Sequence, residues 1–108
     1  MSLTLTELEI QLKKVNSRTF HYEASKAEFP YTVYAEYRKR SKHADNTSYA
    51  SFWRVQIDCY TKVHNDPVPD DIEFMLKVNK IPHTLSRVFD YELKAIRHIF
   101  DCDGIQDG

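Results

Sequence analysis

Residues 52–62, FWRVQIDCYTK, alternate apolar and polar side chains over most of their length. A repeat of two residues is that of a β-strand with one buried face and one exposed face. The segment therefore predicts a half-buried strand, which requires partner strands beside it and other elements to cover its apolar face. The apolar positions of this repeat are Trp53, Val55, Ile57 and Cys59.

Two segments before it have a similar composition. Residues 20–24 alternate aromatic or small residues with polar ones, and residues 31–37, YTVYAEY, are rich in aromatic and β-branched residues. Both features favour strands. We expect a short strand over residues 20–24, a connector over residues 26–30 and a second strand over residues 31–37.

The C-terminal third permits two interpretations. In residues 93–102, some apolar side chains have helical spacing, whereas alternate residues of the same segment fit a strand. Periodicity alone does not choose between them. We favour a hairpin of residues 84–89 and 93–102 that turns near residues 90–92, partly because of the family resemblance given at the end of this section.

Two further segments have the apolar spacing of amphipathic helices. The first covers residues 5–15, and Thr4 and Glu7 fit a capping box at its start. The second covers residues 69–79 and follows proline and acidic residues that suit a helix N-terminus. The residues expected on their apolar sides are Leu5, Leu8, Leu12 and Val15 in the first helix and Ile72, Met75 and Leu76 in the second.

These segments follow the order α-β-β-β-α-β-β and predict an α+β fold. The connections between strands are mostly short, which suits a mainly antiparallel sheet. We expect about four to five strands, a common sheet size, with the two helices packed on one face. Because 108 residues suffice for one hydrophobic core, we predict a single domain over residues 1–108. Residues 1–3 and 104–108 are expected to be flexible ends.

The composition is that of a globular protein, with 42% hydrophobic and 29% charged residues. No apolar run approaches the roughly 20 residues that span a bilayer. The N-terminus also lacks the pattern of a secretory signal. We therefore expect a soluble protein made in the cytosol, with no membrane partner. Cys59 and Cys102 are expected to be reduced, buried thiols.

Few patterns typical of enzymes or cofactor sites occur in the chain. Both glycines, Gly104 and Gly108, lie near the C-terminus, so a glycine-rich phosphate-binding loop is excluded. The five histidines are scattered singly, without the paired spacing of metal ligands. Asp101 and Asp103 look like the start of a calcium loop, but the remaining ligands are missing, which favours a solvated C-terminus. We expect a non-enzymatic protein with no metal and no cofactor.

A cluster of potential cations follows the second predicted strand, although the net charge of the chain is only −1. We place the cluster in a basic loop over residues 38–43, because loops on a rigid scaffold often carry function. One interpretation is contact with DNA phosphates or with an acidic partner. The other is a solvated hairpin tip. The residues of the cluster are Arg38, Lys39, Arg40, Lys42 and His43.

Three tyrosines, Tyr22, Tyr34 and Tyr60, form a second candidate surface. Depending on the register of the strands, they leave an aromatic patch on the sheet face away from the helices. Exposed aromatic patches are typical of interaction surfaces. The alternative is that a loop or a helix covers them. We name these tyrosines as a candidate assembly surface.

Three segments carry a resemblance to a known family: residues 29–37 (FPYTVYAEY), 43–62 (HADNTSYASFWRVQIDCYTK) and 90–100. They are similar to a Phe-Pro-Tyr entry into a strand, an Ala-Asp-Asn segment before a strand that ends in Tyr-Thr-Lys, and a closing hairpin. These features belong to the small tail-completion proteins of long-tailed bacteriophages and prophages, also called tail terminators or head–tail joining proteins. The resemblance covers most of the chain, although the final strand alternates less regularly than the family pattern.

The resemblance implies a structural subunit of a phage or prophage tail, located in the virion and made in the cytoplasm of the bacterial host. It further implies a homo-oligomeric ring, a hexamer, at the head-proximal end of the tail. The partners implied are tail-tube and head-connector proteins, with DNA passing through the channel. No catalytic residue carries over, because the family is not enzymatic. The rival hypothesis is a small DNA-binding or protein-binding module that uses residues 38–43.

Overall fold

The described part of the chain contains two helices and five strands in the predicted order α-β-β-β-α-β-β. The computed structural model describes residues 3–25, 28–44 and 48–107. Neither of the helices in these ranges is long and apolar enough to cross a membrane. The elements are α1 (Leu5–Val15), β1 (Thr19–His21), β2 (Tyr31–Ala44), β3 (Ser48–Thr61), α2 (Val68–Val78), β4 (His83–Asp90) and β5 (Ala95–Gln106).

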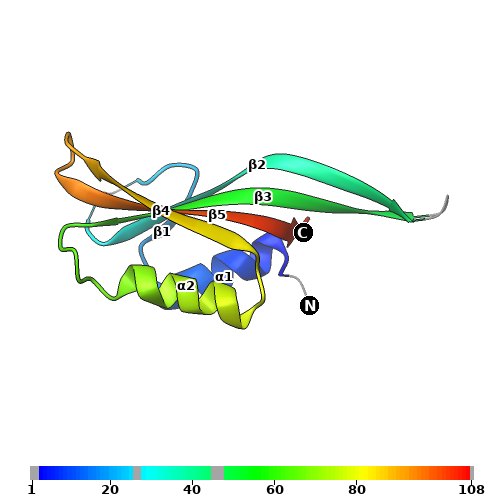
Figure 1. The fold of residues 1–108 in the computed structure, drawn as a ribbon, viewed down its shortest axis with the longest axis horizontal. Helices are drawn as coiled ribbons and strands as arrows, with labels where there is room; N and C mark the ends of the chain where they lie inside the picture. The colour runs from blue at the N-terminus through cyan, green and yellow to red at the C-terminus, as the bar shows by residue number, and fades with distance from the viewer. Residues whose placement is uncertain (1–2, 26–27, 45–47, 108) are drawn as a thin grey trace.

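The strands form one sheet in the order β1-β2-β3-β5-β4. β1 pairs with β2 in parallel, and the other neighbouring strands pair antiparallel. Both helices lie on the same side of the sheet (Figure 1). The prediction of an α+β fold with a mainly antiparallel sheet and both helices on one face is therefore confirmed.

The hydrophobic core lies between the helices and the central strands. Leu8 and Leu12 of α1 and Ile72 and Leu76 of α2 are almost completely buried. They belong to one cluster with Phe100 of β5, which is also fully buried. Complete burial of one such side chain contributes about 1.5–3 kcal/mol, so this cluster supplies much of the stability of the fold.

Both helices begin within one residue of the predicted position. The Thr4 side chain accepts a hydrogen bond from the Glu7 amide at 3.1 Å, and the Thr4 amide donates to the Glu7 carboxylate at 2.9 Å. This capping box satisfies two amide groups that the first turn leaves without helical partners. α2 covers Val68–Val78, one residue earlier than predicted at each end; it has Pro69 and two acidic residues in its first turn and buries the predicted Ile72, Met75 and Leu76.

The last third is a hairpin rather than a helix, as favoured. β4 and β5 pair from Asp90↔Ala95 to His83↔Cys102, and residues 91–94 form the turn. The turn therefore includes the predicted start of the second strand at Leu93. Cys59 and Cys102 are free and buried, as expected, and burial raises the pKa of each thiol to about 12.

The expectation of a flexible end over residues 104–108 is wrong for residues 104–106, which continue β5. Ile105 is fully buried and pairs with Trp53 of β3, while the Gln106 amide donates a hydrogen bond to the Leu3 carbonyl at 2.8 Å. The reason is that burial of Ile105, the apolar residue of this polar tail, together with pairing to β3 keeps the segment in the sheet.

The hairpin of β2 and β3 continues beyond the rest of the sheet (Figure 1). β1 pairs with β2 only as far as Tyr34, and β5 pairs with β3 only from Phe52 onward. We call the part of this hairpin formed by residues 38–44 and 48–52 the arm. The molecule measures 51 × 25 × 22 Å, and the arm extends along the longest axis (Figure 1).

Candidate assembly surfaces

The predicted basic loop is wrong, because residues 38–43 continue strand β2. Arg38 pairs with Arg54, Lys39 with Trp53 and Arg40 with Phe52. The arm extends beyond the helices, so few apolar side chains are needed on its faces to pack against them. A strand at this place therefore does not require alternating apolar residues. A run of cations is therefore compatible with a strand at this place.

Because successive residues of a strand point to opposite faces, these cations lie on both faces of β2, and a β-bulge between Glu36 and Arg38 sets which residue lies on which face. Lys39 pairs with Trp53, which packs against the core, so Lys39 lies on the helix side. Arg38 and Arg40 alternate with Lys39 and lie on the opposite side. We call the sheet face away from the helices the open face. The segment therefore does not present its cations as one patch.

Acidic residues at the C-terminal end of the chain neutralise two of these cations. Arg40 Nη2 lies 2.9 and 3.0 Å from the two carboxylate oxygens of Asp103. Lys39 Nζ lies 3.0 Å from Asp107 Oδ2 and 5.5 Å from the centre of the Trp53 ring system. Sequence reasoning named the cations but not these partners, because residues about 65 positions apart meet only through the strand order.

Of the remaining cations of the segment, the structure describes the side chain of Arg38 but not those of Lys42 and His43. Arg38 is exposed and has no ion-pair partner within the described ranges. Among the predicted cations whose side chains are described, Arg38 is thus the one without an ion pair.

The open face carries further ion pairs. The Tyr37 hydroxyl donates to Asp101 at 2.7 Å and accepts from Arg54 Nε at 3.2 Å. Arg97 Nη2 lies 2.9 Å from Asp58 Oδ2. Arg54 Nη2 lies 3.6 Å from Asp101 Oδ2, and an exposed pair of this kind contributes little to stability, about 0.2–1 kcal/mol. The Arg97–Asp58 pair is partly buried. These pairs make the open face polar, and no described helix covers it (Figure 1).

The predicted aromatic patch does not form. Tyr34 is 4% exposed, faces α1 and donates its hydroxyl to the Glu9 carboxylate. Burial and this hydrogen bond raise the pKa of Tyr34. Tyr60 is on the open face, where its ring stacks on Tyr31 with 4.7 Å between centroids. Only Tyr22 is strongly exposed, so the named tyrosines do not share a surface. The register decides this, because Tyr34 pairs with a core residue of β3.

His21 connects the remaining tyrosine to the sheet edge. Its ring lies between those of Tyr22 and Tyr34, with centroid distances of 4.2 and 4.5 Å. His21 Nε2 is 2.6 Å from Glu36 Oε1. Burial opposes ionisation of Glu36, but the His21 hydrogen bond and a backbone hydrogen bond outweigh it, so the Glu36 pKa is lowered. Within residues 3–25, 28–44 and 48–107, no three side chains of His, Cys, Asp and Glu are placed to hold a metal ion.

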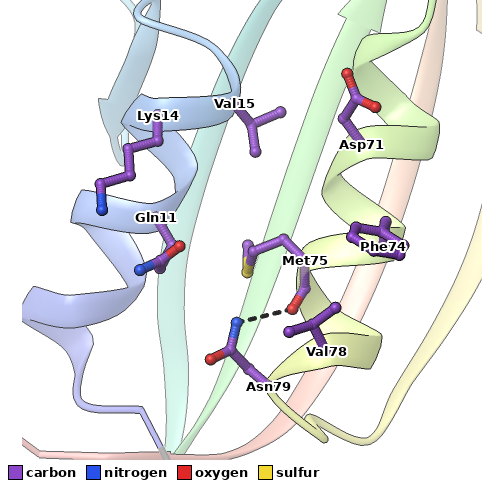
Figure 2. Close-up of a pocket in the computed structure, with 8 residues that line it drawn as sticks. All are labelled: Gln11, Lys14, Val15, Asp71, Phe74, Met75, Val78 and Asn79. Atoms are coloured by element: carbon purple, nitrogen blue, oxygen red, sulfur yellow. Dashed lines mark hydrogen bonds between the residues drawn. The ribbon is translucent and has the colours of Figure 1, made fainter.

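Sequence reasoning missed an apolar groove between α1 and α2. The groove has a volume of about 420 Å³ and is lined on its apolar side by Val15, Phe74, Met75 and Val78 (Figure 2). Phe74 is 68% exposed and Val78 61%. The signal was present, because Phe74 and Val78 are four residues apart on α2 and lie outside its buried stripe.

A second exposed apolar region is the tip of the β4–β5 hairpin. Val88 and Phe89 are half-exposed, and Tyr91 is 82% exposed. The Phe89 and Tyr91 rings meet edge to face with 4.9 Å between centroids. We call residues 88–94 the tip. In Figure 1 the tip and the arm lie at opposite ends of the molecule. Exposed apolar side chains at a hairpin end are typical of a contact surface.

Comparison with known proteins gives one informative likeness. No family model and no curated protein matches the chain. Among solved structures, the fold is similar to that of a chain in the "Virion of native gene transfer agent (GTA) particle", with a TM-score of 0.55. The likeness covers 94% of this chain and 92% of that chain at 8% sequence identity. It establishes a shared fold over nearly the full length of both chains.

Proposed function

We propose that the chain is a structural subunit of a phage-like particle, which works by assembly with other virion proteins and not by catalysis. The observation that carries this proposal is the shared fold with a virion chain, which extends over 94% of this chain. A fold by itself does not define a function, so the surfaces must support the proposal independently.

Two features of the surface support an assembly role. The arm reaches beyond the sheet and offers a strand edge without a neighbour beyond Tyr34 in the described residues. Free strand edges can pair with strands of other chains. The groove and the tip add apolar contact area on different elements. A subunit with contact surfaces at several places suits an assembly with more than one neighbour.

The more specific form of the proposal is a tail terminator or head–tail joining subunit. It would form a ring, a hexamer, at the head-proximal end of the tail of a long-tailed phage or prophage, in contact with tail-tube and head-connector proteins. Support comes from the resemblance of residues 29–37, 43–62 and 90–100 to that family and from the element order. The protein would be made in the host cytoplasm and end in the virion.

The test uses a variant that lacks most of the arm. In this variant, an Asn-Gly turn joins Arg40 to Phe52, which the hairpin register brings opposite each other. Mass in solution is measured over a concentration series, alone and with the tail-tube protein encoded in the same phage or prophage. The full chain is expected to form a ring or a complex with the tail-tube protein, and the shortened chain is expected to lose the complex with that partner. A full chain that stays monomeric under both conditions would contradict the proposal.

DNA binding through residues 38–43 is the rival function, and the exposed, unpaired Arg38 is the observation that favours it. The pairing of Lys39 and Arg40 with carboxylates reduces the charge available for phosphates. The rival predicts salt-dependent DNA affinity that is lost in the triple alanine variant of Arg38, Lys39 and Arg40. No detectable DNA affinity at low salt would exclude it.

A further inference from the structure

The tip carries an exposed aromatic side chain, and the groove is a hollow with apolar lining. Tyr91 is 82% exposed and its ring contacts that of Phe89. The groove is concave, and its volume of about 420 Å³ is within the range of sites that bind small molecules, so it has room for an aromatic side chain. Phe74 and Val78 give it an apolar wall (Figure 2). Aromatic anchors in such hollows often dominate the energy of protein interfaces.

The charges at the two surfaces are also complementary. Figure 2 shows Lys14 on α1 and Asp71 on α2, which line the groove from opposite helices. The turn of the tip contains Glu92 and Lys94. None of these four side chains has an ion-pair partner within the described part of the chain. The second carboxylate of the tip, Asp90, accepts hydrogen bonds from the amides of Glu92 and Leu93 in the turn. Glu92 and Lys94 therefore remain to pair across the contact, and a pairing of Glu92 with Lys14 leaves Lys94 available for Asp71.

We propose that the tip of one copy of the chain inserts into the groove of a second copy, with Tyr91 against Phe74 and Val78. This inference rests on the proposed function and deepens it, because it names the two surfaces through which copies associate. The tip belongs to β4 and β5, and the groove to α1 and α2, so the contact is heterologous. Every copy that uses one tip and one groove leaves one of each free, which continues the assembly until a ring closes.

The main experiment mixes two variants that each lose one surface. Tyr91→Asp disables the tip and Phe74→Asp disables the groove, and both residues are exposed enough for the fold to persist. Each variant alone is expected to be monomeric, with association weakened at least about 30-fold. An equimolar mixture is expected to form dimers and nothing larger, because one intact tip meets one intact groove. Val63→Asp is the matched control, since this position is also exposed but lies outside both surfaces.

A second measurement keeps the proposal testable when association is weak. The single variants Lys14→Cys and Glu92→Cys are mixed at high concentration and oxidised, and a cross-linked heterodimer is expected. The native Cys59 and Cys102 are fully buried, so they should not form disulfides under these conditions. Each variant alone should give few homodimers, because the contact is heterologous.

The outcomes separate this inference from the proposed function. Copies that associate by mass, but give no heterodimer and are unaffected by Tyr91→Asp, would overturn the inference and leave the assembly role in place. Copies that do not associate, either alone or with the tail-tube protein, would overturn both. A dimer that forms equally well from Tyr91→Asp alone would show a contact through other surfaces and would also refute the inference.

Discussion

The helix-covered part of the β2–β3 hairpin and the arm are built from the same two strands but differ in the burial and the charge of their side chains. In the covered part, Val55, Ile57 and Cys59 of β3 are fully buried beneath the helices. In the arm, the described side chains of Arg38, Lys39 and Arg40 are exposed. One half of the hairpin contributes to a core, and the other half has no core beneath it.

This difference indicates a division of roles along the hairpin. Burial of apolar area stabilises the covered part, whereas the ion pairs at the base of the arm are exposed and stabilise it only weakly. Substitutions in the covered part should therefore change the free energy of unfolding. Substitutions in the arm should change association and leave folding nearly intact.

The largest effect is expected from Phe100→Ala. Phe100 is fully buried, so its truncation removes apolar contacts and leaves a cavity, at a cost of about 3–5 kcal/mol in the free energy of unfolding. Phe74→Ala, the same chemical change at a 68% exposed position, is the control and should cost less than about 0.5 kcal/mol. Urea unfolding of both variants measures the contrast. Equal losses would show that the core is not where the structure places it.

The next effect concerns pH and the buried His98, which is 3% exposed. Its Nδ1 accepts a hydrogen bond from Arg87 Nε at 3.0 Å, so Nε2 carries the proton toward Thr61 Oγ1, also at 3.0 Å. Burial and the Arg87 charge lower the pKa of His98. The unfolded chain, with a histidine pKa of about 6.5, therefore binds more protons than the folded chain.

Stability should consequently fall as the pH decreases below about 6.5. Thermal unfolding between pH 7.5 and 5 measures this dependence. His98→Asn, which removes the titrating group, should flatten the curve over the same range. An unchanged slope in that variant would show that other groups cause the dependence.

A smaller effect is expected from Tyr34→Phe, at the junction between the covered part and the arm. The change removes the hydroxyl that donates to Glu9 and keeps the buried ring. Loss of one hydrogen bond to a charged acceptor should cost about 1.5–3 kcal/mol at most, and less here because Glu9 is partly solvated. Chemical unfolding measures the change. Tyr91→Phe, at a tyrosine that is 82% exposed, is the control and should be neutral.

The smallest effect on folding is expected from Arg40→Ala, which breaks the ion pair with Asp103. Because both side chains are partly exposed, the loss should be within about 0.2–1 kcal/mol and should shrink further in high salt. Asp103→Ala should cost more, since it also removes the hydrogen bond that the Gly104 amide donates to Asp103 at 2.9 Å. A loss of several kcal/mol would contradict the division of roles.

The elements were largely predictable from the sequence, because core packing imposes a repeat. Leu8 and Leu12 recur at helical spacing and are buried, and the alternation from Trp53 to Cys59 marks the buried side of β3. The arm was mistaken for a loop for the converse reason. Where no core lies beneath a strand, no repeat is required, and a run of cations resembles a loop.

The candidate surfaces were less predictable. The cations of residues 38–43 were named correctly as a cluster, but their partners Asp103 and Asp107 follow from the position of β5 beside β3. The faces of Tyr34 and Tyr60 depend on strand register, which composition does not specify. The groove also depends on how two helices are placed relative to each other. These helices are separated in the chain by the 52 residues between Val15 and Val68.

The bulge at Tyr37 divides strand β2 into two parts that differ in which sequence positions face the helices. N-terminal to it, the alternation of β2 is dictated by the helices, and C-terminal to it the alternation is shifted by one residue. Deletion of Tyr37 would restore one continuous alternation and leave Arg38, Lys39 and Arg40 on their present sides, because each keeps its partner on β3. The extra residue thus changes which sequence positions of the arm face the helix side, while the pairing with β3 and the core stay the same.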